Sequence, residues 1–88
     1  MSQKAVYRIY TENKNIKRIK YILNTRFDSY TIYNAVGIWK GKDEKTLVIE
    51  IIGSDMLEVY SVAESVRKIN KQDAVLVTKS FVEGELIV

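Results

Sequence analysis

Hydrophobic and polar residues alternate at the start of the chain and then change period. Residues 5–11 are rich in β-branched and aromatic types that alternate in polarity, which predicts a β-strand. Beyond Asn15 the isoleucine and leucine residues recur at spacings of three and four, and this pattern ends near Arg26. That period predicts a helix with Asn13 or Asn15 as its N-cap.

The next segment has the pattern of a β-hairpin. Residues 30–40 form a long strand-like run, and Gly37 within it predicts either a bulge or a close approach of another group. Gly41-Lys42-Asp43-Glu44 is interpreted as the hairpin loop, and residues 46–52, rich in Val and Ile, as the partner strand.

Helical periodicity returns after Gly53. Asp55 and Glu58 have the spacing of a capping box, and the apolar residues that follow mark one face of a helix reaching about Asn70. Residues 74–82 predict the last main strand. Residues 83–85 predict a turn into a possible short fifth strand at 86–88.

The resulting order βαββαβ favours an α+β, ferredoxin-like sandwich. In this fold a four-stranded antiparallel sheet carries two helices on one face, and the third strand lies between the first and the second. A chain of 88 residues is too short for two independent cores, so residues 1–88 are interpreted as a single domain.

One face of this sheet is left without helices. A regular second strand places Thr31, Tyr33 and Trp39 on it, and Arg8, Tyr10 and Glu50 are expected to join them. An apolar face of this kind favours burial by a second copy of the chain or by the C-terminal segment. The alternative is that its aromatic residues stack on bases, although the third strand lacks the signature of RNA-recognition modules.

Composition removes several classes of chemistry. Cysteine and histidine are both absent, which excludes disulfides, thiolate nucleophiles, Cys/His zinc sites and an imidazole base. A catalytic hypothesis would use Glu44, Glu50 or Asp73, or one of the strand tyrosines, but no spacing selects a pair, so no catalytic residue, metal site or cofactor is predicted. No apolar run is long enough to cross a bilayer and no signal peptide is evident, so the expectation is a cytoplasmic protein without a membrane partner.

Charge is distributed unevenly along the chain. Residues 1–42 carry nine Lys or Arg against two acids, whereas residues 43–88 carry five against nine, giving +7 and −4. A basic stripe on the outside of the first helix contains Lys14, Lys17, Arg18 and Tyr21. This stripe predicts contact with nucleic acid or with a protein, or is simply a solvated helix face.

The hairpin region 37–44 concentrates unusual residues. Trp39 is the single tryptophan, and it is followed by Lys40 and Lys42. Trp39 is suited to stack on an aromatic ligand while a lysine neutralises negative charge. Hairpin geometry explains the glycine and acid of this segment equally well.

Several of these residues form a pattern that resembles an uncharacterised bacterial family of small domains of unknown function. The pattern runs from Arg26-Phe27 through Thr31, Gly37-x-Trp39 and Glu44 to Gln72, and the resemblance covers residues 26–78. It implies that Arg26, Thr31, Trp39, Glu44 and Gln72 are the positions of interest. The alternative is that Glu44 and Gln72 only bind backbone groups at strand ends.

The leading hypothesis is a non-enzymatic homo-oligomer, assembled through its open sheet face, that binds a small anionic or nucleotide-like ligand. It would act as a sensor or, in a phage or mobile element, as a sequestering protein. The candidate ligand-binding residues are Arg26, Thr31, Tyr33, Trp39, Lys40, Glu44 and Gln72. The rivals are a nucleic-acid or protein-binding module that uses the basic stripe, and a small enzyme of unknown substrate.

Overall fold

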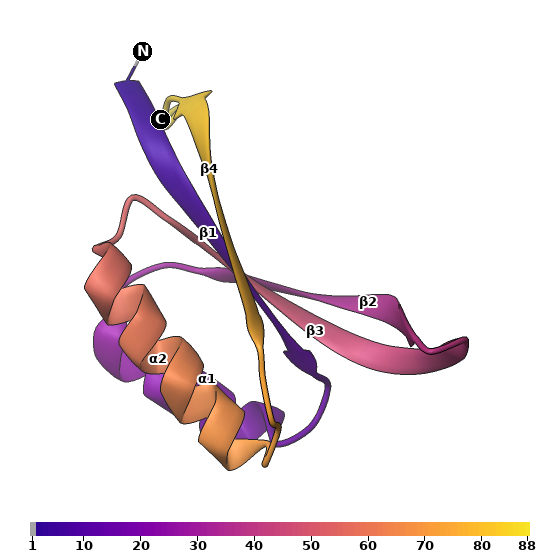
Figure 1. The fold of residues 1–88 in the computed structure, drawn as a ribbon. Helices are drawn as coiled ribbons and strands as arrows, with labels where there is room; N and C mark the ends of the chain where they lie inside the picture. Colours follow the sequence, from indigo (N-terminus) through magenta and orange to yellow (C-terminus); the bar gives the residue numbers. More distant parts are fainter. Residues whose placement is uncertain (1) are drawn as a thin grey trace.

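Two helices lie on one side of a four-stranded antiparallel sheet (Figure 1). The computed structural model describes residues 2–88. The elements in chain order are β1 (Ser2–Glu12), α1 (Ile16–Arg26), β2 (Thr31–Trp39), β3 (Lys42–Ile52), α2 (Met56–Ile69) and β4 (Leu76–Gly84). This order confirms the predicted βαββαβ arrangement and the ferredoxin-like α+β class.

The strand order across the sheet is β2-β3-β1-β4, so β3 lies between β1 and β2 as predicted. The register places Glu50 opposite Arg8 of β1 and opposite Thr31 of β2. In the next pairs of the same face, Val48 lies opposite Tyr10 and Tyr33. The predicted grouping of these side chains on one face is therefore confirmed. We call this side of the sheet the open face.

The core lies between the other face of the sheet and the helices. Ile9 and Ile49 from the sheet meet Leu23 of α1 and Val62 of α2 in one buried cluster. Burying a side chain of this size contributes about 1.5–3 kcal/mol, so the cluster holds both helices against β1 and β3. On the open face Val6 and Val48 are also buried, at 1% and 2% exposure, by the side chains around them.

The two helices begin differently. Asp55 is the N-cap of α2, and its carboxylate accepts a hydrogen bond from the Leu57 backbone N–H at 3.1 Å. Asn15 is the N-cap of α1, but it has a left-handed backbone and its side chain makes no capping bond. The predicted helix starts are confirmed, and the side chain of Asn15 is left for contacts with α2.

The hairpin turn differs from the prediction. Lys40 and Gly41 alone form it, with φ values of 50° and 78°. Positive φ at both central residues defines the two-residue turn whose twist matches that of paired strands. The predicted loop at 41–44 is wrong because Lys42 to Glu44 pair with Trp39 to Gly37. A bulge at Gly37 is wrong as well, since this register is continuous, whereas the predicted close approach is confirmed by Thr46.

The C-terminal prediction is also wrong. β4 pairs with β1 up to Gly84 opposite Ser2, so residues 83–84 continue the ladder in place of the predicted turn. Residues 85–88 belong to no strand, and Leu86 and Ile87 are each 84% exposed. No strand is formed at 86–88, because residues 83–84 continue the ladder with β1 where a turn back was predicted.

The β2–β3 hairpin extends past the helices, away from their end of the sheet (Figure 1). Val36 and Ile38, which lie on the helix side of β2, are therefore 71% and 73% exposed. The end of the hairpin has no helix against either face.

Candidate functional site

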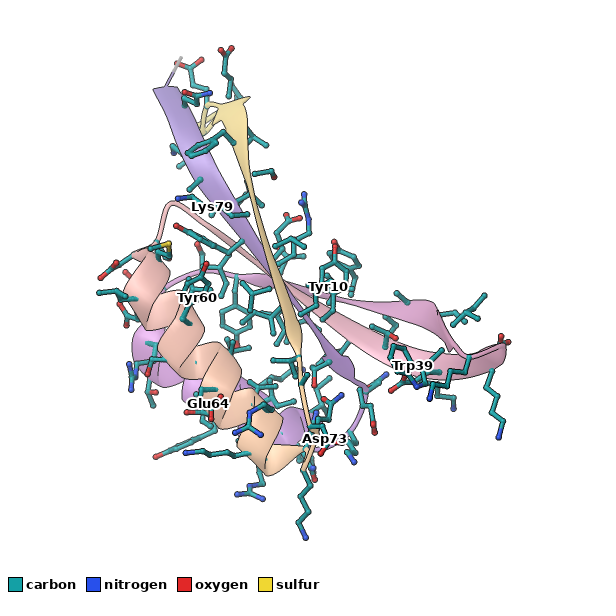
Figure 2. All side chains as sticks on the ribbon, in the orientation of Figure 1. Tyr10, Trp39, Tyr60, Glu64, Asp73 and Lys79 are labelled. Atoms are coloured by element: carbon teal, nitrogen blue, oxygen red, sulfur yellow. The ribbon has the colours of Figure 1, made fainter. Side chains whose placement is uncertain are left out.

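A groove of about 340 Å³ lies where the hairpin passes the end of β1 and the start of β4. We call it the Trp39 groove. Figure 2 shows Tyr10 near the crossing of the strands and Trp39 farther out along the hairpin. The lining residues are Tyr10, Thr11, Glu12, Gly37, Ile38, Trp39, Glu44, Thr46, Gln72 and Leu76. Three of the predicted ligand-binding residues, Trp39, Glu44 and Gln72, thus lie around one space.

Gln72 reaches this groove from the loop between α2 and β4. Its Oε1 accepts a hydrogen bond from the Thr11 hydroxyl and a second one, at 3.2 Å, from the Glu12 backbone N–H. Its own backbone oxygen accepts from Arg67 Nη1 at 3.1 Å. Gln72 therefore binds a backbone group at the end of β1, as the alternative interpretation proposed. Its side-chain NH₂ group has no hydrogen-bond acceptor within residues 2–88.

A buried polar network fixes this loop. Asn70 is 0% exposed and donates from Nδ2 to the Thr11 hydroxyl at 2.9 Å and to the Glu12 carbonyl at 3.1 Å. Its Oδ1 accepts from Asn15 Nδ2 at 3.1 Å. Buried polar groups are stable only when they are paired, and here each has a partner. The network thus holds Gln72 in a defined position.

Trp39 supplies the large apolar surface of the groove. Its side chain is 68% exposed, and Lys40 Nζ stands 5.7 Å from the centroid of its ring. An exposed indole with a cation above it is suited to stack on a planar ligand. The left-handed backbone of Lys40 in the turn brings this cation back over the neighbouring ring.

The charges inside the groove are negative. Glu12 forms an ion pair with Lys14 at 3.2 Å, whereas Glu44 has no ion-pair partner within the described chain. The cations Lys40 and Lys42 lie at the tip of the hairpin. An anion is therefore expected at the lysine rim, and a hydrogen-bond donor is expected next to Glu44.

The remaining predicted ligand residues lie elsewhere on the chain. Thr31 and Trp39 stand at opposite ends of β2, about 26 Å apart at 3.3 Å per residue. Arg26 ends α1, is exposed, and lines a separate polar groove of about 310 Å³ with Ser54, Asp55 and other residues near the start of α2. One chain therefore cannot bring Arg26 and Trp39 onto the same small ligand.

Tyr33 lies at a third position, on the open face of the edge strand β2. It lies beside the ion pair that Arg8 Nε forms with Glu50 Oε2 at 2.9 Å. The hydrogen bond that Arg8 donates to Glu50 raises the pKa of Arg8 above its ordinary value, and Tyr33 adds to this effect. Sequence reasoning placed Arg8 and Glu50 on one face but did not pair them. Their register across β1 and β3 was the missing information.

The basic stripe lies on the helix side. Lys14 is engaged by Glu12, whereas Lys17, Arg18 and Tyr21 line another groove, of about 470 Å³, together with Ile22 and Ile69. This groove is lined by both helices and is separate from the Trp39 groove.

The described part of the chain contains neither a cluster of metal-ligand side chains nor a helix suited to cross a membrane. Within residues 2–88, no set of three His, Cys, Asp or Glu side chains is placed to hold a metal ion. Across the same residues, neither helix has the length and apolar character needed to span a membrane.

Comparison with known proteins gives a fold-level result. No protein-family model matches the chain, and no curated protein sequence matches it. The family resemblance noted for residues 26–78 therefore has no support from family models. Among solved structures, a DUF3240 family protein from Shewanella baltica OS155 has a TM-score of 0.72 at 11% identity, covering 100% of this chain and 99% of that one.

Two other solved structures are similar over most of their length. The GlnK–ATP complex of Bacillus subtilis has a TM-score of 0.69 at 23% identity, covering 93% of this chain and 84% of that one. A phage SAM lyase in its apo state has a TM-score of 0.65 at 16% identity, covering 96% and 92%. The chain thus has the fold of a nucleotide-bound protein and of an enzyme alike, and its function must be argued from its own residues.

Proposed function

We propose that this chain is a non-enzymatic, homo-oligomeric domain that binds a small, anionic, nucleotide-like ligand in the Trp39 groove. The observation that carries the proposal is the meeting of Trp39, Glu44 and Gln72 around one groove, with Lys40 over the same indole. An aromatic face, a carboxylate, an amide and a cation are the groups that proteins use to recognise a base and its phosphate.

The ligand would lie along the groove with its base on Trp39. Glu44 would accept a hydrogen bond from an exocyclic amine of the base, and the NH₂ group of Gln72 would donate to a ring nitrogen or a carbonyl. The phosphate would face outward to Lys40 and Lys42, away from the groove carboxylates. This orientation gives each charged group of the ligand an opposite charge or a hydrogen-bond partner.

A second copy of the chain would complete the site. With Trp39 68% exposed, the groove of one chain cannot enclose a ligand. A neighbouring copy can supply Arg26, Thr31 and Tyr33, which one chain holds too far from Trp39. This arrangement gives all seven predicted residues a place at one ligand.

The sheet offers two surfaces for such assembly. Tyr33 is 41% exposed and Leu76 is 59% exposed on the open face. The edge strand β2 has nine residues and contains neither a charged residue nor a proline, the usual features that keep sheet edges from pairing. Both surfaces favour contact with another copy of the same chain.

The role of such a protein would be to sense the ligand or to sequester it. The structural similarity to GlnK, which is bound to ATP in its solved structure, supports a nucleotide as the first class to test. Sequestration would require only tight binding, whereas sensing would require a change in the oligomer or in the exposed hairpin on binding.

Calorimetry and Trp39 fluorescence with the anionic nucleotides ATP, ADP, AMP and GMP test the proposal. We expect one of these ligands to quench Trp39, and we expect Trp39→Ala and Glu44→Gln each to weaken binding by about tenfold or more. Val36→Ala is the matched control, because Val36 is exposed on the same strand and does not line the groove. Equal binding by wild type and Trp39→Ala, or no binding of any of the four ligands, contradicts the proposed site.

The same samples test the enzymatic alternative. Each ligand is incubated with the protein and analysed by chromatography and mass spectrometry. An unchanged ligand is expected from a binding protein. Turnover that Glu44→Gln or another groove variant abolishes would instead make this chain an enzyme.

A further inference from the structure

The groove between the two helices combines an apolar floor with a basic rim. Lys17, Arg18, Tyr21 and Ile22 line it from α1, and Ile69 lines it from the end of α2, around a volume of about 470 Å³. Tyr21 is 72% exposed, and together with Ile22 and Ile69 it forms an apolar surface that is open to solvent. We call this surface the helix groove.

The walls of the helix groove are fixed relative to each other. Asn15, directly before α1, donates from Nδ2 to the Ile69 carbonyl at 3.3 Å and to Asn70 Oδ1 at 3.1 Å. Asn70 is in turn anchored to β1 by its bonds to Thr11 and Glu12. The groove is therefore formed before any partner arrives, which reduces the entropy lost on binding.

Two cations in the first turn of α1 lie where positive charge disfavours the helix. The helix contains no acidic residue, and its first turn carries Lys17 and Arg18. The N-terminus of a helix has a partial positive charge, so cations there are unfavourable and acids are favoured. Neither residue has an ion-pair partner within residues 2–88. Lys20 on α1, Lys68 on α2 and Lys71 just after α2 add further positive charge.

We propose that the helix groove docks an acidic peptide segment of a partner protein, with an apolar side chain on the floor and carboxylates on the rim. The apolar anchor would pack on Tyr21, Ile22 and Ile69, and the carboxylates would pair with Lys17 and Arg18. This matches helix-in-groove recognition, in which apolar anchors give affinity and complementary charges give orientation and fast association. The proposal does not depend on the ligand of the Trp39 groove.

The composition of the floor favours a peptide over a nucleic acid. Bases stack on aromatic rings, and Tyr21 is the one aromatic residue among the five that line the groove. A phosphate backbone would contact Lys17 and Arg18 but would leave Ile22 and Ile69 without an apolar partner. An acidic peptide with an apolar side chain covers both parts of the surface.

The test begins with a random peptide library displayed on phage and selected against the purified protein. We expect the enriched sequences to combine Asp or Glu with Leu, Ile, Phe or Trp. The best sequence is then synthesised with a fluorescent label, alongside a version with every acid replaced by its amide. Fluorescence anisotropy should show that the acidic peptide binds, that its affinity falls with salt, and that the amide version binds about tenfold more weakly or worse.

Variants of the protein locate the site. Peptide binding should be weakened by about tenfold or more in the double variant Lys17→Glu with Arg18→Glu, and likewise in the single variant Tyr21→Ser. Lys20→Glu is the matched control for Lys17→Glu alone, since each reverses one charge on α1 and Lys20 lies outside the groove lining; it should weaken binding less than Lys17→Glu does. The double variant places acids at the helix start, so its melting temperature should stay level or rise while binding falls. Weaker binding without a lower melting temperature distinguishes the loss of the docking surface from the loss of the fold.

Several results would overturn the proposal. The first is a selection that yields no acidic, apolar sequences. The second is a peptide whose affinity does not change when Lys17 and Arg18 are replaced. The third is a peptide whose binding Lys20→Glu weakens as much as Lys17→Glu does. A labelled single-stranded oligonucleotide is measured in parallel at low salt. If it binds and competes with the peptide while Tyr21→Ser abolishes its binding, the groove is a nucleic-acid site.

Discussion

Gly37 of β2 faces Thr46 of β3 so closely that a Cβ added to Gly37 would lie 2.7 Å from the Thr46 hydroxyl oxygen. Both residues line the Trp39 groove. The Thr46 hydroxyl donates to the Glu44 carbonyl at 3.3 Å, which favours the rotamer that faces Gly37. The glycine is thus required by the neighbouring side chain, since the strand is regular and Gly37 has no positive φ.

Gly37→Ala should therefore destabilise the protein by about 1–3 kcal/mol, as overpacking does. In an open strand the same change would stabilise, because alanine loses less backbone entropy on folding. Thr46→Ala removes the clashing oxygen, so the double variant should be more stable than Gly37→Ala alone. Urea unfolding of all four proteins measures the coupling, and strictly additive losses would show that the contact is not the cause.

The helices and strands could be predicted because their periods differ and their caps are local. The position of the hairpin turn could not, because Lys40 adopts a positive φ that sequence patterns assign to glycine or asparagine. The loop was predicted to begin at Gly41, one residue too late, and to include Lys42 to Glu44, which are in fact the first residues of β3. The prediction of a fifth strand was wrong for another reason, because the pairing of Gly84 with Ser2 extends β4 through the predicted turn.

The candidate site could be predicted in part. Trp39, Glu44 and Gln72 line one groove because the outer part of the hairpin and the α2–β4 loop lie at the same end of β1. Thr31 is close to Trp39 in sequence yet is separated from it by the length of β2. The buried contacts of Asn70 were missed, because a polar residue after a helix is ordinarily an exposed cap and only the packing against β1 buries it.

Asn70 should be among the polar residues whose loss is most damaging. Asn70→Ala removes the donor to Thr11 and to the Glu12 carbonyl and the acceptor for Asn15. Leaving such groups buried and unpaired costs about 1–3 kcal/mol, and thermal or urea unfolding should show this loss. Asn13→Ala is the control, because its one side-chain hydrogen bond, to Asn34, is exposed and should matter by only a few tenths of a kcal/mol. Equal effects of the two changes would contradict the importance of the network.

Glu64 should titrate at a lower pH than an ordinary glutamate. Arg67 donates to both of its carboxylate oxygens, at 2.5 and 2.9 Å, and this hydrogen bonding holds the pKa of Glu64 below its ordinary value. Because the folded-state pKa is lowered, the pair stabilises the fold above the unfolded pKa of a glutamate, and this contribution is lost as pH falls through the folded value.

Carbon NMR of the Glu64 carboxyl group measures this pKa directly. In Arg67→Gln the pKa should return toward the ordinary glutamate value, whereas Lys68→Gln, which removes only a weaker charge effect, should move it much less. A Glu64 pKa that is unchanged in Arg67→Gln would show that the ion pair does not persist in solution. The pair is exposed, so the global unfolding curve is expected to change little.

Substitution of two tyrosines of similar exposure distinguishes assembly through the open face from assembly through the helices. Tyr33 lies on the open face at 41% exposure, and Tyr60 lies on α2 at 46%. If copies meet through the open face, Tyr33→Lys should bury a charge in the interface and dissociate the oligomer, whereas Tyr60→Lys should leave it intact. Light scattering over a dilution series gives the mass of each form.

Because the proposed ligand site needs the neighbouring copy, Tyr33→Lys should also abolish quenching of Trp39 by ligand, although Trp39 itself is unchanged. A monomeric wild type, or dissociation by Tyr60→Lys alone, would contradict assembly through the open face.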